Sequence, residues 1–97
     1  MTELARKPDG TSAHTLKVGE FSYRIDPKTS ERKWFSFRIS EMPAAITIPI
    51  APQSLESGAS WTISGDADAP TIHPSVDSRC GSHRWHGWIK DGKAVSC

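Results

Sequence analysis

The dipeptide Asp91-Gly92 constrains the fold of this chain more than any other short stretch. Two-residue hairpin loops of type I′ need positive φ at both central positions, and Asp-Gly is one of the few pairs that supply it. Such a loop also sets the register of the two strands that it joins. We therefore predict an antiparallel hairpin in which Lys90 faces Lys93, Trp88 faces Val95 and Gly87 faces Ser96.

Extending that register by one pair places His86 opposite Cys97. Directly opposed residues have Cβ atoms about 5 Å apart, so an imidazole would stand beside a thiol. Cys80 and His83, spaced C-x2-H, lie just upstream in a predicted loop that can fold over this pair. Two cysteines and two histidines form a complete ligand set for a closed tetrahedral zinc site. We therefore predict a zinc site made of Cys80, His83, His86 and Cys97.

Other interpretations of these residues remain open. His73 lies between Pro70 and Pro74 on a rigid segment aimed at the same loop, and it could replace one ligand. The cysteines could instead be ordinary buried thiols, or form a Cys80–Cys97 disulfide. The chain has no secretion signal, so we expect a reducing cytoplasmic compartment, where a metal or free thiols are favoured over a disulfide.

The composition restricts the class of protein. A chain of 97 residues makes one domain, and an apolar content of 36% is low, so its core must depend on aromatic residues and isoleucines. The net charge of +1 argues against a nucleic-acid-binding protein driven by bulk charge. No apolar run is long enough to span a membrane. We expect a cytoplasmic protein whose partner is another protein, with no membrane association and with nucleic acid disfavoured as a partner.

Short alternating segments follow one another along the chain, and none has helical periodicity. Residues 14–26 and 34–39 flank a polar turn and predict a hairpin, with a β-bulge where the alternation shifts at Gly19-Glu20. Isoleucines at every second position of residues 46–50, together with Pro49, predict an edge strand. Two further short strands are expected near residues 61–63 and 71–73.

These segments predict an all-β fold, a small antiparallel barrel or sandwich of about six or seven short strands with a C-terminal hairpin. We expect residues 14–97 to form this single β domain, with the Cys/His cluster in residues 80–97. Residues 1–13 are polar and lack periodicity, and they are predicted to be an N-terminal arm.

Three stretches of the last third share a pattern with known proteins. They are P-T-I-H-P-S-V at residues 70–76, C-G-S-H at residues 80–83 and W-H-G-W-I-K-D-G at residues 85–92. This part of the chain resembles a family of small uncharacterised proteins of bacteriophages and bacteria. The family shares P-T-[LI]-x-P-S-[IV], a Cys/His cluster and an aromatic strand that ends in D-G. Some bacterial members lie in operons with ubiquitin-like proteins and their activating and conjugating enzymes.

Our leading prediction of function is a non-enzymatic, zinc-stapled β module of phage or phage-related origin. It would act through protein contacts as an accessory or assembly factor, in the host cytoplasm or associated with the virion. The alternative is a small zinc-dependent hydrolase or peptidase in a ubiquitin-like pathway. Such an enzyme would keep a water on a three-ligand metal and use Asp66, Asp68 or Asp77 as general base.

Two further possibilities carry less weight. A nucleic-acid-binding β barrel could stack bases on a surface formed by Tyr23, Arg24, Trp34 and Arg38. Nucleophilic catalysis could use a serine, but Ser75 and Ser82 have no evident orienting partner beyond His73 and His83.

Overall fold

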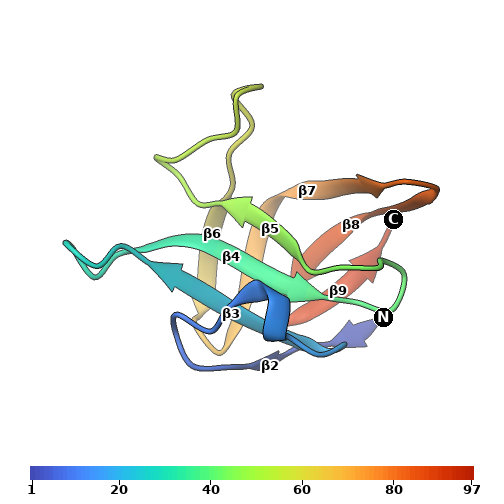
Figure 1. Ribbon diagram of the computed structural model, residues 1–97, viewed down its shortest axis with the longest axis horizontal. Helices are drawn as coiled ribbons and strands as arrows, with labels where there is room; N and C mark the ends of the chain where they lie inside the picture. Colours follow the sequence, from blue (N-terminus) through green and yellow to red (C-terminus); the bar gives the residue numbers. More distant parts are fainter.

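Two β-sheets pack against each other in the computed structural model, which describes residues 1–97 (Figure 1). The five-stranded sheet has the order β1 (Thr2–Glu3), β9 (Lys93–Ser96), β8 (His83–Lys90), β7 (Ala69–Cys80) and β6 (Thr62–Asp66). The four-stranded sheet has the order β2 (Ala5–Arg6), β3 (Glu20–Ile25), β4 (Arg32–Arg38) and β5 (Ile46–Pro49). The predicted all-β fold is confirmed as a sandwich. None of its elements is a helix long and apolar enough to cross a lipid bilayer.

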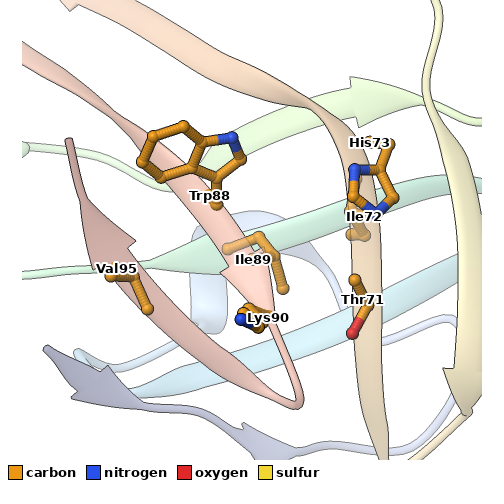
Figure 2. A pocket seen from close by; sticks show the side chains of 7 residues that line it. All are labelled: Thr71, Ile72, His73, Trp88, Ile89, Lys90 and Val95. Atoms are coloured by element: carbon orange, nitrogen blue, oxygen red, sulfur yellow. The ribbon is translucent and has the colours of Figure 1, made fainter.

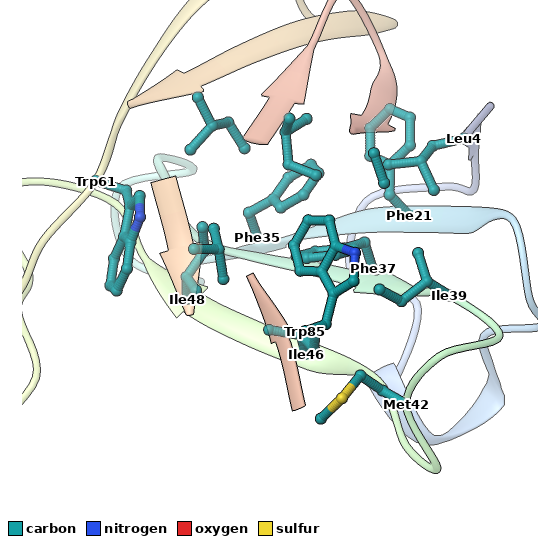
Figure 3. Close-up of a cluster of buried hydrophobic side chains, with 14 of the residues drawn as sticks. Leu4, Phe21, Phe35, Phe37, Ile39, Met42, Ile46, Ile48, Trp61 and Trp85 are labelled. Atoms are coloured by element: carbon teal, nitrogen blue, oxygen red, sulfur yellow. The ribbon is translucent and has the colours of Figure 1, made fainter. Parts of the chain in front are cut away.

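The core lies between the two sheets and is dominated by aromatic side chains (Figure 3). Phe35, Phe37 and Ile39 share one face, as predicted, and all three are fully buried. The ring of Phe37 meets the indole of Trp85 edge to face, with centroids 5.7 Å apart. Because Phe37 belongs to β4 and Trp85 to β8, this contact joins the two sheets.

The first predicted strand begins later than expected. Residues 13–15 form a short 3-10 helix, and β3 starts only at Glu20, so the strand predicted over residues 14–26 is wrong in its first part. Gly19 has a φ of +88° and turns the chain, which explains the shift in alternation without a bulge. The edge position predicted for the strand with Pro49 is confirmed, because β5 pairs only with β4.

The N-terminal segment is ordered by strands of the domain itself. β1 pairs with β9 of one sheet, and β2 pairs in parallel with β3 of the other. Leu4, between them, is 7% exposed and belongs to the core. The first six residues therefore cross from one sheet to the other, and they account for two of the nine strands. The domain boundary at residue 13 stays a prediction.

The C-terminal hairpin has the predicted register. Asp91 and Gly92 have φ values of +49° and +75°, and Lys90 pairs with Lys93. The loop predicted before His83 is wrong. β7 continues through Cys80, and only a tight turn at Gly81-Ser82 separates it from β8. The long pairing of β7 with β8 outweighs the polar character of residues 77–80, because the backbone groups of both strands are satisfied in the ladder.

Candidate active site

The outer face of the five-stranded sheet gathers the polar side chains of β7 and β8. Along β8 the buried residues Trp85, Gly87 and Ile89 alternate with the exposed residues Arg84, His86, Trp88 and Lys90. This period of two is the ordinary alternation of a strand with one face on a core. The neighbouring strand β7 adds His73, Ser75 and Asp77 to the same outer face, since Ile72 and Val76 point into the core.

An irregularity in β7 positions Ser75. The regular pairing of β7 with β8 is interrupted between Ile72 and Val76, where three residues of β7 stand opposite the single residue Trp88. Bulged strands bend locally and redirect side chains, and they are common beside active sites. Here the Oγ atom of Ser75 lies 3.1 Å from the Nε2 atom of His86. This is the separation expected between a nucleophilic hydroxyl and its general base.

Buried groups hold the backbone of Ser75 from the inner side. The indole Nε1–H of Trp61 donates a hydrogen bond to the carbonyl oxygen of Ser75, at 3.3 Å. Trp61 is only 8% exposed, and its own backbone is tied to the end of β5 through bonds with Pro49 and Ala51. The serine hydroxyl therefore faces outward from a backbone that is anchored to the core.

His86 is held by the close packing of β8. The backbone N–H of Cys97 donates to the carbonyl oxygen of His86, at 2.9 Å. The next residue, Gly87, lies against the carbonyl oxygen of Val95, and a Cβ there would come within 2.5 Å of the indole of Trp85. Only glycine allows this approach, so the backbone that carries His86 lies unusually close to its neighbours.

Asp77 supplies negative charge beside the histidine. It faces His86 directly in the ladder. Its two carboxylate oxygens accept hydrogen bonds from the guanidinium of Arg84, at 3.2 and 3.0 Å. These bonds lower the pKa of the Asp77 carboxyl below its usual value, and the charges of Arg84, Arg79 and His86 act in the same direction. The carboxylate thus stays ionised next to the imidazole.

The four predicted zinc ligands form two separate pairs. Cys80 and His83 are partners across the β7–β8 turn, whereas Cys97 adjoins His86 at the end of β9. Strand alternation places His83 and His86 on opposite faces of β8. Both cysteines are free and exposed, and no group of three or more His, Cys, Asp or Glu side chains is arranged to hold a metal. The zinc site stays a prediction.

Most of the other candidate residues predicted from the sequence lie away from the Ser75–His86 pair. Asp66 accepts a hydrogen bond from the backbone of Asp68 at 2.8 Å, which is ordinary turn geometry, and Asp68 also pairs with Arg6. Asp77 alone of the three predicted bases lies beside His86. Tyr23 is 1% exposed, so it cannot offer a stacking surface to a nucleic acid.

The pairing of Ser75 with His86 escaped the sequence analysis, which considered only nearer histidines. The two residues are eleven positions apart and meet because β7 and β8 form a hairpin. A signal was present, because Ser75 belongs to the P-S-V stretch and His86 to the W-H-G stretch of the shared pattern.

Residues 9–97 match the family described as bacterial ubiquitination-like system serine protease (BubE). No curated protein and no solved structure matches the chain. The family match shows that our leading prediction, a non-enzymatic zinc-stapled module, is wrong. The alternative, a peptidase in a ubiquitin-like pathway, agrees better with the family match. The family is described as a serine protease, however, and not as a zinc enzyme. Because the match spans almost the whole sequence, the chain belongs to the BubE family of bacterial ubiquitination-like system serine proteases.

Proposed function

We propose that this protein cleaves a polypeptide of the bacterial ubiquitination-like system, with Ser75 as nucleophile and His86 as general base. The observation that carries the proposal is the 3.1 Å approach of Ser75 Oγ to His86 Nε2 on an exposed face. Membership of a serine protease family supports this class of reaction. The proposal uses only side chains of the chain itself.

The chemistry follows from the positions of these two groups. His86 acts in the tautomer whose Nε2 is free to accept a proton, and this atom takes the proton of Ser75 while Oγ attacks the carbonyl carbon of the scissile bond. The C–N bond then breaks, and Nε2 returns the proton to the leaving amine. A water molecule attacks the resulting ester, with His86 again accepting a proton. The ester C–O bond then breaks, Nε2 returns its proton to Ser75 Oγ, and the carboxylate product leaves.

Asp77 assists without contacting the substrate. In each half of the reaction His86 becomes an imidazolium, and a negative charge close by stabilises that state. The carboxylate of Asp77 faces His86 and is kept ionised by Arg84. Asp77 is therefore a positioning and electrostatic residue in this proposal.

A fluorophosphonate probe tests the nucleophile, because it reacts covalently with an activated serine hydroxyl. Mass spectrometry should find one adduct, on Ser75, and Ser75→Ala should abolish it. His86→Gln should slow labelling by about 100-fold or more, since general-base catalysis contributes at least that much. Ser82→Ala and His83→Gln are matched controls at the exposed β7–β8 turn and should label as the unchanged protein does.

Cleavage is measured with a ubiquitin-like protein that carries extra C-terminal residues. The unchanged protein should remove the extension, and Ser75→Ala should not. Labelling on a serine other than Ser75, or cleavage that persists in Ser75→Ala, would contradict the proposal. Loss of cleavage on removal of zinc would contradict a reaction that uses only Ser75, His86 and Asp77.

A further inference from the structure

A depression of about 400 Å³ lies on the outer face of the sheet (Figure 2). Two of its lining residues, His73 and Trp88, stand two positions from Ser75 and His86 along β7 and β8. Its walls and floor come from three adjacent strands: Thr71, Ile72 and His73 of β7, Trp88, Ile89 and Lys90 of β8, and Val95 of β9. The described reaction uses none of these residues. Figure 2 shows the indole of Trp88 and the ring of His73 at one end, and Lys90 toward the β8–β9 turn.

Strand geometry connects the depression to the reacting pair. Trp88 follows His86 by two residues on the exposed face of β8, and Ser75 follows His73 by two residues on β7. Two residues of extended chain span about 6.6 Å. A polypeptide that lies along the sheet with its scissile carbonyl at Ser75 would therefore place a side chain about two residues away into the depression.

The lining selects the chemistry of that side chain. Trp88 is 42% exposed although it is the largest apolar side chain on this face, and Val95, its partner in the β8–β9 ladder, lies on the same face. Ile72 and Ile89 point into the core, so only their backbone lies beneath the depression. An exposed indole beside the aliphatic side chain of Val95 is covered best by a large aliphatic or aromatic group, because burial removes the apolar surfaces of both partners from water.

A lysine at the turn end adds a charge preference. Lys90 and Lys93 are directly opposed in the ladder, and neither forms an ion pair in the structure. Glu3 of β1 faces Lys93 from the other side of β9, so it can offset the charge of that lysine. Lys90, which lines the depression, has no carboxylate opposite it in the ladder. The charge of this end of the depression is therefore complementary to an acidic group.

We propose that this depression is a substrate subsite for an extended polypeptide. It takes a large apolar side chain about two residues from the scissile bond, followed by an acidic residue that meets Lys90. The inference rests on the proposed function and deepens it by naming the substrate sequence that the site prefers. Trp88 is its main specificity-determining residue.

The first experiment digests a mixture of peptides of random sequence and identifies every cut by mass spectrometry. Leu, Ile, Phe or Met should be enriched two residues from the cut, on one side of it, with Asp or Glu beside them. A matched pair of fluorogenic peptides that differ only as Leu or Ser at that position should then differ in kcat/KM by about 10- to 100-fold.

Variants assign the preference to the depression. Trp88→Ala should reduce the Leu/Ser ratio of kcat/KM to about 3 or less, and Trp88→Phe should restore part of it. Lys90→Gln should abolish the preference for Glu over Gln at the neighbouring position. Leu55→Ala is the control, because Leu55 is similarly exposed at 43% but lies on the loop after β5. It should keep the full ratio.

The outcomes separate this inference from the proposed function. No enrichment of apolar residues, or an unchanged ratio in Trp88→Ala, would overturn the subsite while Ser75 labelling still supports the protease. Absence of Ser75 labelling in the unchanged protein would overturn both. Thermal unfolding of each variant shows whether the fold is kept, and partial recovery in Trp88→Phe excludes a general loss of structure as the cause.

Discussion

Gly87 shows at the scale of one residue how the site depends on close packing. It separates the two functional side chains of β8, His86 and Trp88, and it faces the core. No side chain fits there, because the carbonyl oxygen of Val95 and the indole of Trp85 occupy the space of a Cβ. The glycine thus allows β8 to pack closely on its inner face while His86 and Trp88 project from its outer face.

Gly87→Ala should lower the free energy of unfolding by about 1–3 kcal/mol, the usual cost of overpacking, and should also slow labelling of Ser75 as His86 shifts. Denaturant titration and fluorophosphonate labelling measure the two effects. Gly10→Ala is the comparison, since Gly10 has a φ of +85° but nothing within 4 Å of its Cβ position. That variant should lose only about 1 kcal/mol, from backbone strain, and keep its labelling rate. Equal losses of unfolding free energy in the two variants would contradict the close packing inferred at Gly87.

The irregular stretch of β7 is the element that makes the site. Between Ile72 and Val76 the regular pairing of β7 with β8 is interrupted. In this stretch the indole N–H of Trp61 holds the carbonyl oxygen of Ser75. A regular strand would keep one residue opposite Trp88, and Ser75 would then have a different position relative to His86. Trp61 acts through Ser75 and does not contact the substrate.

Trp61→Phe should slow Ser75 labelling several-fold while KM for a peptide substrate stays nearly constant, because the serine loses its anchor and the apolar depression is intact. The lost hydrogen bond should cost about 0.5–1.5 kcal/mol of stability. Trp85→Phe is the matched control. It removes a similar hydrogen bond, the one that the indole N–H of Trp85 donates to Ser96 Oγ at 3.1 Å. If both variants lose similar stability but only Trp61→Phe labels Ser75 more slowly, the bond from Trp61 to the Ser75 carbonyl positions the serine. Equal rates in both variants would argue for a merely structural tryptophan.

At the scale of the whole molecule, Tyr23 ties the two sheets together. Its hydroxyl, on β3, donates to the carbonyl oxygen of Ala67 in the β6–β7 turn, at 2.8 Å. The guanidinium groups of Arg6 and Arg32 lie over its ring, 5.2 and 4.9 Å from the centroid. The turn that leads into β7 is thereby attached to the four-stranded sheet.

Burial raises the pKa of the Tyr23 phenol above its usual value, and the charges of Arg6 and Arg32 offset only part of this rise. A pKa that is higher in the folded state gives stability that is complete below the unfolded value of about 10 and is lost as the pH rises through the folded value. The protein should therefore lose stability above pH ~10 more steeply than Tyr23→Phe does. Since the chain has one tyrosine, phenolate absorbance reports its titration directly. Titration at the same pH in folded and urea-unfolded protein would contradict this expectation.

Several features of the fold follow from the sequence alone because their causes are local. Positive φ at Asp91 and Gly92 determines the hairpin and its register, and Phe35, Phe37 and Ile39 share a face because strand side chains alternate. The resemblance in the last third also indicated the bacterial ubiquitin-like setting that agrees with the family match.

The tertiary structure alone decided the candidate site. Ser75 meets His86 only because β7 departs from its ladder beside Trp88, and that departure depends on Trp61 from a distant part of the chain. Pro74 is a local signal for the irregularity, because it has no backbone N–H to donate and β7 is a central strand. It does not indicate which side chain of β8 Ser75 meets. The spacing of Cys80, His83 and His86 suggested one cluster, but Cys80 faces His83 across the β7–β8 turn, and alternation along β8 places His86 on the face opposite His83. Local rules specify strands and turns, whereas pairing across the sheet specifies which side chains meet.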